Sequence, residues 1–173
     1  SAMITIKPDP AVPLNRQLYD ARETVLKRIN KSNDKLVELT DRLSDAEETI
    51  AKVEASLKGI ETKEADSLRE LNKVMTDSIK NIRQFIFGKP MEKQGYGRPY
   101  QETVSMRMRE ARMAVTSKEK MPDTQEIAVV VLAETLVQEA VQRTNLFFNT
   151  HWKQYEKQVN KNPVSLFKEF KDL

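Results

Sequence analysis

The stretch INKSNDKLVELTDRLSDAEETIAKVEASLKGI, residues 29–60, decides the fold of this chain. Apolar residues recur in it at alternating steps of three and four, the heptad period that keeps one stripe of a helix against a partner helix. Most residues between these positions are charged or polar. Because a helix cannot bury a single apolar seam alone, later segments must cover it. The seam consists of Ile29, Ser32, Leu36, Leu39, Leu43, Ala46, Ile50, Val53, Leu57 and Ile60.

The composition suits a helical bundle with much of its surface in water. The 173 residues are enough for one domain with its own core, and the presence of only four glycines argues against a turn-rich β protein. The 29 basic residues nearly cancel the 26 acidic ones, and the two signs are interleaved. Nucleic-acid binding would need a basic stripe, so we expect no nucleic-acid partner. With no apolar run of about 18 residues, we also expect no membrane insertion and a soluble protein.

The sequence offers little catalytic chemistry. Cysteine is absent, which excludes disulfides, thiolate metal sites and a cysteine nucleophile. His151 is the only histidine, and no G-x-S-x-G elbow accompanies it. Phe148 stands where a di-iron bundle would need a glutamate three residues before the histidine. The glycines match no phosphate-binding loop. We therefore expect no catalytic residues, no metal and no cofactor, and we do not expect an enzyme.

The first thirteen residues differ from the rest. Ile4 and Ile6 alternate with polar residues as in a strand, and prolines at positions 8, 10 and 13 then exclude a regular helix. We expect residues 1–13 to be the end of a preceding β domain and a linker, with a flap lying on the bundle as the alternative. The Ser1-Ala2 pair resembles a cloning scar. Residues 14–173 would then be a helical domain cut from a longer protein.

Four helices are predicted, over residues 14–58, 62–87, 101–117 and from 124 to Pro163. Gly59 and Gly88 end the first two, and the short turn at Gly59 makes the second helix run back along the first. Residues 30–34 are poor helix formers, so the first helix could break there. We favour a continuous or kinked helix over a full break. Clustered β-branched residues around 127–131 would also suit a strand, but the helical period continues to Val159. We therefore expect an all-α, antiparallel four-helix bundle with long, coiled-coil-like helices and a short strand-like lead-in. The last of its helices should have the widest apolar face and be the most buried.

The loop at residues 88–101 is the candidate interaction surface. It contains Tyr96, Arg98 and Tyr100, and tyrosine and arginine are the residues favoured at binding hot spots. The alternative is that these side chains pin the loop onto its own domain. Nearby methionines could form an adaptable binding surface, although core filling is the preferred interpretation. They are Met106, Met108, Met113 and Met121.

Three motifs resemble one family. They are ITIKPDP near the start, IFGKPMEKQG at residues 86–95, and residues 145–155 followed by a P-x-S-x-F-K tail from Pro163. Together they resemble the carboxy-terminal helical region of sortilin-like, BNR-repeat propeller proteins, which are exported, glycosyl hydrolase-like and common in Bacteroidetes. The resemblance implies a non-catalytic interaction or stabilising module of a periplasmic or extracellular parent. Its partner would be a protein, either the parent's own upstream domains or another chain, and a monomer is favoured.

Two other readings of the sequence remain open. One is a self-standing coiled-coil scaffold that forms a homodimer through the seam of residues 29–60. The other is an enzyme in which the tyrosine-arginine loop and acidic residues form a site.

Overall fold

The computed structural model describes residues 15–90 and 101–161, and all regular structure in these two ranges is helical. The strand-like lead-in, the residues Tyr96, Arg98 and Tyr100, and the tail from Pro163 lie outside the described residues. The predicted all-α class is confirmed for the described part of the chain. Its elements are α1 (Arg16–Ser56), α2 (Lys63–Phe87), α3 (Val104–Thr116), α4 (Thr124–Leu146), the π-helix η1 (Phe147–Trp152) and α5 (Lys153–Lys161).

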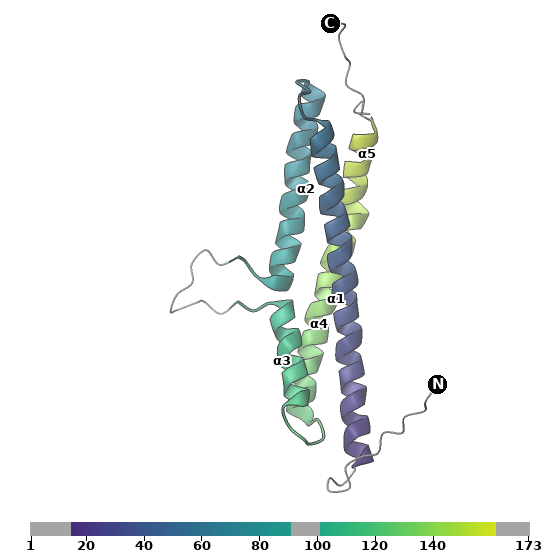
Figure 1. Cartoon of the computed structure of the whole chain (residues 1–173), viewed down its shortest axis with the longest axis vertical. Helices are drawn as coiled ribbons and strands as arrows, with labels where there is room; N and C mark the ends of the chain where they lie inside the picture. The colour runs from purple at the N-terminus through teal and green to yellow at the C-terminus, as the bar shows by residue number, and fades with distance from the viewer. Residues whose placement is uncertain (1–14, 91–100, 162–173) are drawn as a thin grey trace, which may run out of the picture.

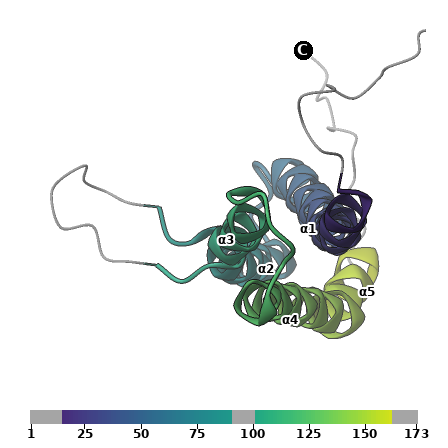
Figure 2. The ribbon, with the colours of Figure 1, turned by 90° about the horizontal axis from the view of Figure 1, so that it is seen from below.

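Helix α1 runs along the length of the molecule and is shared by the other helices (Figure 1). Helix α2 returns along one part of α1, and α3 continues along the other part in the same direction as α2. Seen along the long axis, α3 lies in front of α2 (Figure 2). The rod formed by α4, η1 and α5 then runs back beside them. Helix α1 contacts α2, α3 and α4, so the later segments divide the coverage of its seam between them.

Helix α1 is continuous through residues 30–34, as favoured by the sequence, and the alternative of a full break is wrong. Ile29, Ser32 and Leu36 are all buried, so the seam passes through this segment without interruption. Tertiary burial therefore outweighs the poor helix propensity of the surrounding polar residues. The helix ends at Ser56, slightly before the predicted position, and Gly59 makes the turn with a φ of +84°.

Most of the predicted seam lies in the core, whereas its members Val53 and Ile60 are half-buried. Leu43 is fully buried, and Leu36 and Ile50 are nearly so. Burying a leucine or isoleucine side chain stabilises the fold by roughly 1.5–3 kcal/mol, so the seam is a major source of stability. The other helices contribute residues to the same cluster. Among them are Met75 and Ile79 from α2, Val104 and Ala111 from α3, and Val130, Ala133 and Val137 from α4.

Helix α4 begins with the capping arrangement expected at Asp123. The Asp123 carboxylate accepts from the backbone N–H groups of Gln125 and Glu126, both at 3.0 Å, and Glu126 accepts from the Asp123 N–H at 3.0 Å. This reciprocal capping box favours helix over strand for the β-branched segment that follows. The apolar face is narrower than expected, because Val131 and Leu132 are exposed.

The helix continues beyond Leu146 through a π-helical turn that the sequence did not predict. A π turn adds residues to a helical turn and so shifts the face that follows it. As a result Phe147 is buried, whereas Phe148 and Trp152, which were expected on the seam, are only half-buried. Aromatic rings cluster at the turn, with the Phe147 and Phe148 rings edge to face and their centroids 5.1 Å apart.

A chain of hydrogen bonds links α5 to α2 and α1, running from the buried Tyr155 and Asn72 to the exposed Glu54. The Tyr155 hydroxyl donates to Oδ1 of Asn72 at 2.8 Å, and Nδ2 of Asn72 donates to Glu54 at 2.6 Å. Burial, together with the nearby Glu54 carboxylate, raises the pKa of Tyr155 from 10.0 to about 12, so its hydroxyl remains a donor even at a pH where an ordinary tyrosine ionises. Because buried polar groups are costly when unpaired, this chain specifies the register of the three helices.

Candidate functional site

The predicted interaction residues Tyr96, Arg98 and Tyr100 lie outside the described residues, so their role stays a prediction. The two ends of their loop are described. The Lys89 N–H donates to Oε1 of Gln101 at 2.7 Å, and Nε2 of Gln101 donates back to the Lys89 carbonyl at 3.4 Å. The side chain of Gln101 therefore clasps the two ends together at the junction of α2 and α3.

Gly88 is required at this clasp for two reasons. Its φ of +91° lies in the region that side-chain-bearing residues rarely adopt. A Cβ at this position would also lie 2.5 Å from Oε1 of Gln101 and 3.2 Å from Cγ2 of Thr103. The glycine thus allows α2 to stop and the chain to leave the bundle beside the start of α3.

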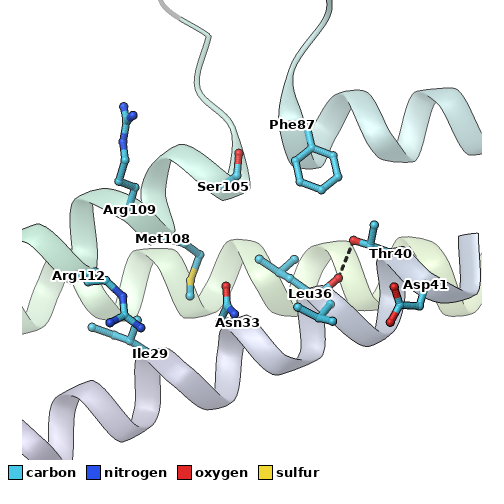
Figure 3. A pocket seen from close by; sticks show the side chains of 11 residues that line it. Ile29, Asn33, Leu36, Thr40, Asp41, Phe87, Ser105, Met108, Arg109 and Arg112 are labelled. Atoms are coloured by element: carbon cyan, nitrogen blue, oxygen red, sulfur yellow. Dashed lines mark hydrogen bonds between the residues drawn. The ribbon is translucent and has the colours of Figure 1, made fainter. Parts of the chain in front are cut away.

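An apolar groove of about 530 Å³ lies beside α1, at the place where α2 ends and α3 begins (Figure 3). Its floor is built from the buried side chains of Ile29, Leu36 and Met108. Val37 of α1 and Phe87 of α2 stand beside it and are 52% and 55% exposed. The groove arises because the chain leaves the helical path between α2 and α3. The remaining lining residues are Asn33, Thr40, Asp41, Ser105, Arg109 and Arg112.

The charges around the groove are unevenly distributed. Arg109 and Arg112 lie on the α3 side, and Asp41 lies toward the opposite end of the groove (Figure 3). Arg112 donates to Oδ1 of Asn30, whereas Arg109 and Asp41 form no hydrogen bond or ion pair with any residue in the described ranges. The groove therefore has a basic side and an acidic end, both able to accept charged partners.

The ends of two helices reinforce this polarity. Ser105 is in the first turn of α3, and Phe87 is the last residue of α2. A helix carries about half a positive charge at its amino end and half a negative charge at its carboxyl end. Both helix ends border the groove. Their partial charges make the electrostatic potential more positive on the α3 side and more negative on the α2 side, as Arg109, Arg112 and Asp41 also do.

A second, shallower depression follows the α1–α4 interface. Arg28 forms a two-point ion pair with Glu134 there, at 3.0 and 2.7 Å, and this hydrogen bonding raises the pKa of Arg28. A small cavity of about 240 Å³ further along the same interface is lined by Lys35, Arg42 and Thr144, among others. The linings of these two surfaces have a larger polar share than the lining of the groove.

Thr144 has an unusual environment beside that small cavity. It is 1% exposed, and its hydroxyl finds no hydrogen-bond partner among the described residues. By contrast, Thr40, Thr76 and Thr135 each donate to the carbonyl four residues earlier, at 2.6 to 2.9 Å. Thr144 therefore carries an unsatisfied polar group in the core, which is a source of instability.

Other candidate chemistry is dispersed. His151 is exposed, and its ring lies against Phe147, with centroids 6.5 Å apart. Over residues 15–90 and 101–161, no group of three or more His, Cys, Asp or Glu residues is arranged to hold a metal ion. Core filling, the preferred role for the methionines, holds for Met108 but is wrong for Met113 and Met121, which are exposed.

Comparison with protein-family models, with curated proteins and with solved structures finds no match to this chain. The resemblance to the helical region of sortilin-like propeller proteins therefore stays a prediction. Among the described helices, none combines the length and the apolar character that a membrane crossing requires.

Sequence reasoning missed the groove. Val37 and Phe87 occupy positions next to, and not on, the apolar seams of their helices, and this is the signal that could have revealed it. Large apolar residues off the seam, one of them directly before a glycine that ends a helix, indicate an apolar surface at a helix junction.

Proposed function

We propose that this chain is a non-catalytic helical module that binds a protein segment. The observation that carries the proposal is the apolar groove at the α2–α3 junction, where Phe87 and Val37 remain about half exposed. Surface apolar residues that gather around a concave floor mark interaction sites more often than isolated exposed ones do. The clasped ends of the loop that holds Tyr96, Arg98 and Tyr100 lie beside this groove and add to its potential contact area.

The architecture that we propose for the module is an antiparallel four-helix bundle organised on α1. The contacts of α1 with α2, α3 and α4 support it. The rigid scaffold places the groove between elements whose positions are fixed by the core and by the Asn72–Tyr155 hydrogen bond. Binding surfaces on rigid elements need little ordering when a partner docks, which favours affinity.

For the setting of the module, we propose the carboxy-terminal end of a larger exported propeller protein of the sortilin-like, glycosyl hydrolase-like type. The support is the set of short motifs around residues 86–95, 145–155 and the tail from Pro163. In that setting the partner is the parent's own upstream domains or another protein, in the periplasm or outside the cell. Propeller-blade repeats encoded directly upstream would support the proposed parent protein, and other sequence there would contradict that proposal.

A substrate screen tests the non-catalytic part of the proposal. The chain is incubated with chromogenic glycosides and phosphoesters, and no turnover above the buffer is expected. Turnover that disappears in the Arg98→Ala variant would overturn the proposal and favour an enzyme with its site in the 88–101 loop. Turnover that is unchanged in that variant would also contradict it and would place the chemistry elsewhere on the chain.

The alternative of a homodimeric coiled-coil scaffold makes a different prediction for the mass in solution. The seam that such a dimer would use is covered within one chain, since Leu36, Leu43 and Ile50 are buried by the protein's own helices. This burial supports a monomer. Sedimentation equilibrium should therefore give about the chain mass of 20.0 kDa, and twice that value would favour the scaffold.

A further inference from the structure

The polarity of the groove identifies the kind of segment that it binds, and this inference rests on the proposed function. The groove follows α1 from Ile29 to Asp41, twelve steps along the helix, which at 1.5 Å per step is about 18 Å. An extended peptide advances about 3.3 Å per residue, so the groove accommodates roughly five or six residues. Its occupant is therefore a short segment and not a whole domain surface.

The centre of the groove selects for apolar side chains. Ile29, Leu36 and Met108 form its floor, and the exposed Phe87 lies across the opening from α1 (Figure 3). The exposed Val37 of α1 also lines the groove. A methionine in such a floor adapts its shape to different apolar side chains. One or two leucine-sized or aromatic anchors of the partner would exclude water from the exposed Phe87 and Val37.

The basic side of the groove selects for a carboxylate. Arg109 has no partner among the described residues, and Arg112 is held only by a neutral asparagine oxygen. Both arginines are exposed. The side chain of Arg112 points toward α1, whereas that of Arg109 extends outward from α3 (Figure 3), where it can reach an acidic side chain lying over that helix. Arginine forms strong two-point hydrogen bonds with carboxylates, and the amino end of α3 adds to the positive potential. At the far end Asp41 disfavours a second acidic group and favours a neutral or basic one.

We propose that the groove binds a short peptide segment of a protein partner, with a central apolar anchor and an acidic residue at the end that lies over α3. A second copy of the chain is the competing occupant, and the Val37→Asp measurement below distinguishes it. The acidic residue sets the direction in which the segment lies, from α3 toward Asp41.

The test is selection from a displayed library of random seven-residue peptides against the full chain. The same selection is run on Arg109→Glu/Arg112→Glu. The matched control is Arg16→Glu/Lys80→Glu, which changes the net charge equally at exposed positions away from the groove. The chain should enrich peptides that combine a large apolar residue with Asp or Glu. These peptides should bind the groove variant about tenfold more weakly and the control variant unchanged. The groove variant should enrich Lys or Arg in place of Asp or Glu.

Two further variants separate the possible failures. Val37→Asp places a charge in the apolar opening and should abolish binding, while its helical circular dichroism should remain unchanged because the residue is exposed. Peptides that bind with no acidic preference, or that bind Val37→Asp equally well, overturn the groove assignment but leave the interaction module standing. A library that yields no binder overturns both the groove assignment and the proposal that the chain is an interaction module. A dimer that dissociates on the Val37→Asp substitution assigns the groove to a second copy and also overturns the peptide proposal.

Discussion

Replacing Thr144 with valine should stabilise the protein, although it removes a polar group without adding any hydrogen bond. Valine and threonine have nearly the same shape, so the substitution leaves the packing of the α4 seam almost unchanged. The hydroxyl that is removed is buried and unpaired. Leaving such a group without a partner costs about 1–3 kcal/mol. We therefore expect the free energy of unfolding to rise by about 1–2 kcal/mol, equivalent to roughly 2–8 °C in the thermal midpoint for a chain of this size.

The assay is equilibrium unfolding in urea, followed by far-ultraviolet circular dichroism. The midpoint concentration should increase while the slope with urea stays constant, which shows that stability and not compactness has changed. The matched control is Thr135→Val on the same helix. Thr135 is exposed and its hydroxyl donates to the Val131 carbonyl, so this substitution should change stability by less than about 0.5 kcal/mol. A Thr144→Val protein that is less stable than the wild type would refute the reasoning, because it would mean that the hydroxyl has a favourable partner.

Three other substitutions test the local geometry. Tyr155→Phe should destabilise the protein by about 1–2 kcal/mol, measured in urea, because it leaves the buried Oδ1 of Asn72 without its donor. Gly88→Ala should lower the thermal midpoint more than Gly59→Ala; both glycines have positive φ, but only at Gly88 would a Cβ collide with neighbouring atoms. Asp123→Asn should remove part of the acid sensitivity of stability, measured by urea unfolding between pH 2 and 5. The hydrogen bond from Lys120 lowers the pKa of Asp123 in the folded state to about 2, and asparagine retains the cap without titrating.

The sign of the last effect follows from the lowered pKa. A carboxyl group whose folded-state pKa is lowered contributes stability above its unfolded pKa, near 3.8, and loses that contribution as the pH falls toward 2. The wild type should therefore lose more stability than Asp123→Asn between pH 5 and pH 2. Identical pH profiles for the two proteins would contradict the assignment. Equal effects of alanine at both glycines, or an unchanged urea midpoint for Tyr155→Phe, would count against the geometry at those positions.

The helices were predictable because their signals are local and repeated. Leu36, Leu43 and Ile50 obey the heptad period and are buried, and the capping signal at Asp123 defines the start of α4 to within a residue. Residues 30–34 show the limit of propensity, because the continuous seam on either side holds them in a helix. The exposure of Val131 was not predictable, because a continuous run of apolar residues does not indicate which of them pack against another helix.

The features that sequence reasoning missed depend on how distant elements meet. The π turn at Phe147 has no residue signature, and it lies where the rod contacts α2. The groove exists because α3 continues past the end of α2, an arrangement fixed by tertiary packing. The predicted residues Tyr96, Arg98 and Tyr100 belong to a loop whose ends lie beside that groove, so local composition indicated the neighbourhood but not the apolar floor itself.

Hydrogen exchange along residues 36–50 tests the central claim most directly, namely that one chain covers its own apolar seam. If α2, α3 and α4 bury this segment within the monomer, its backbone amides should exchange only through global unfolding and at the same rate in dilute and concentrated protein. Rapid exchange of these amides, or protection that appears only at high protein concentration, would contradict the account and show that the seam is open in the isolated chain.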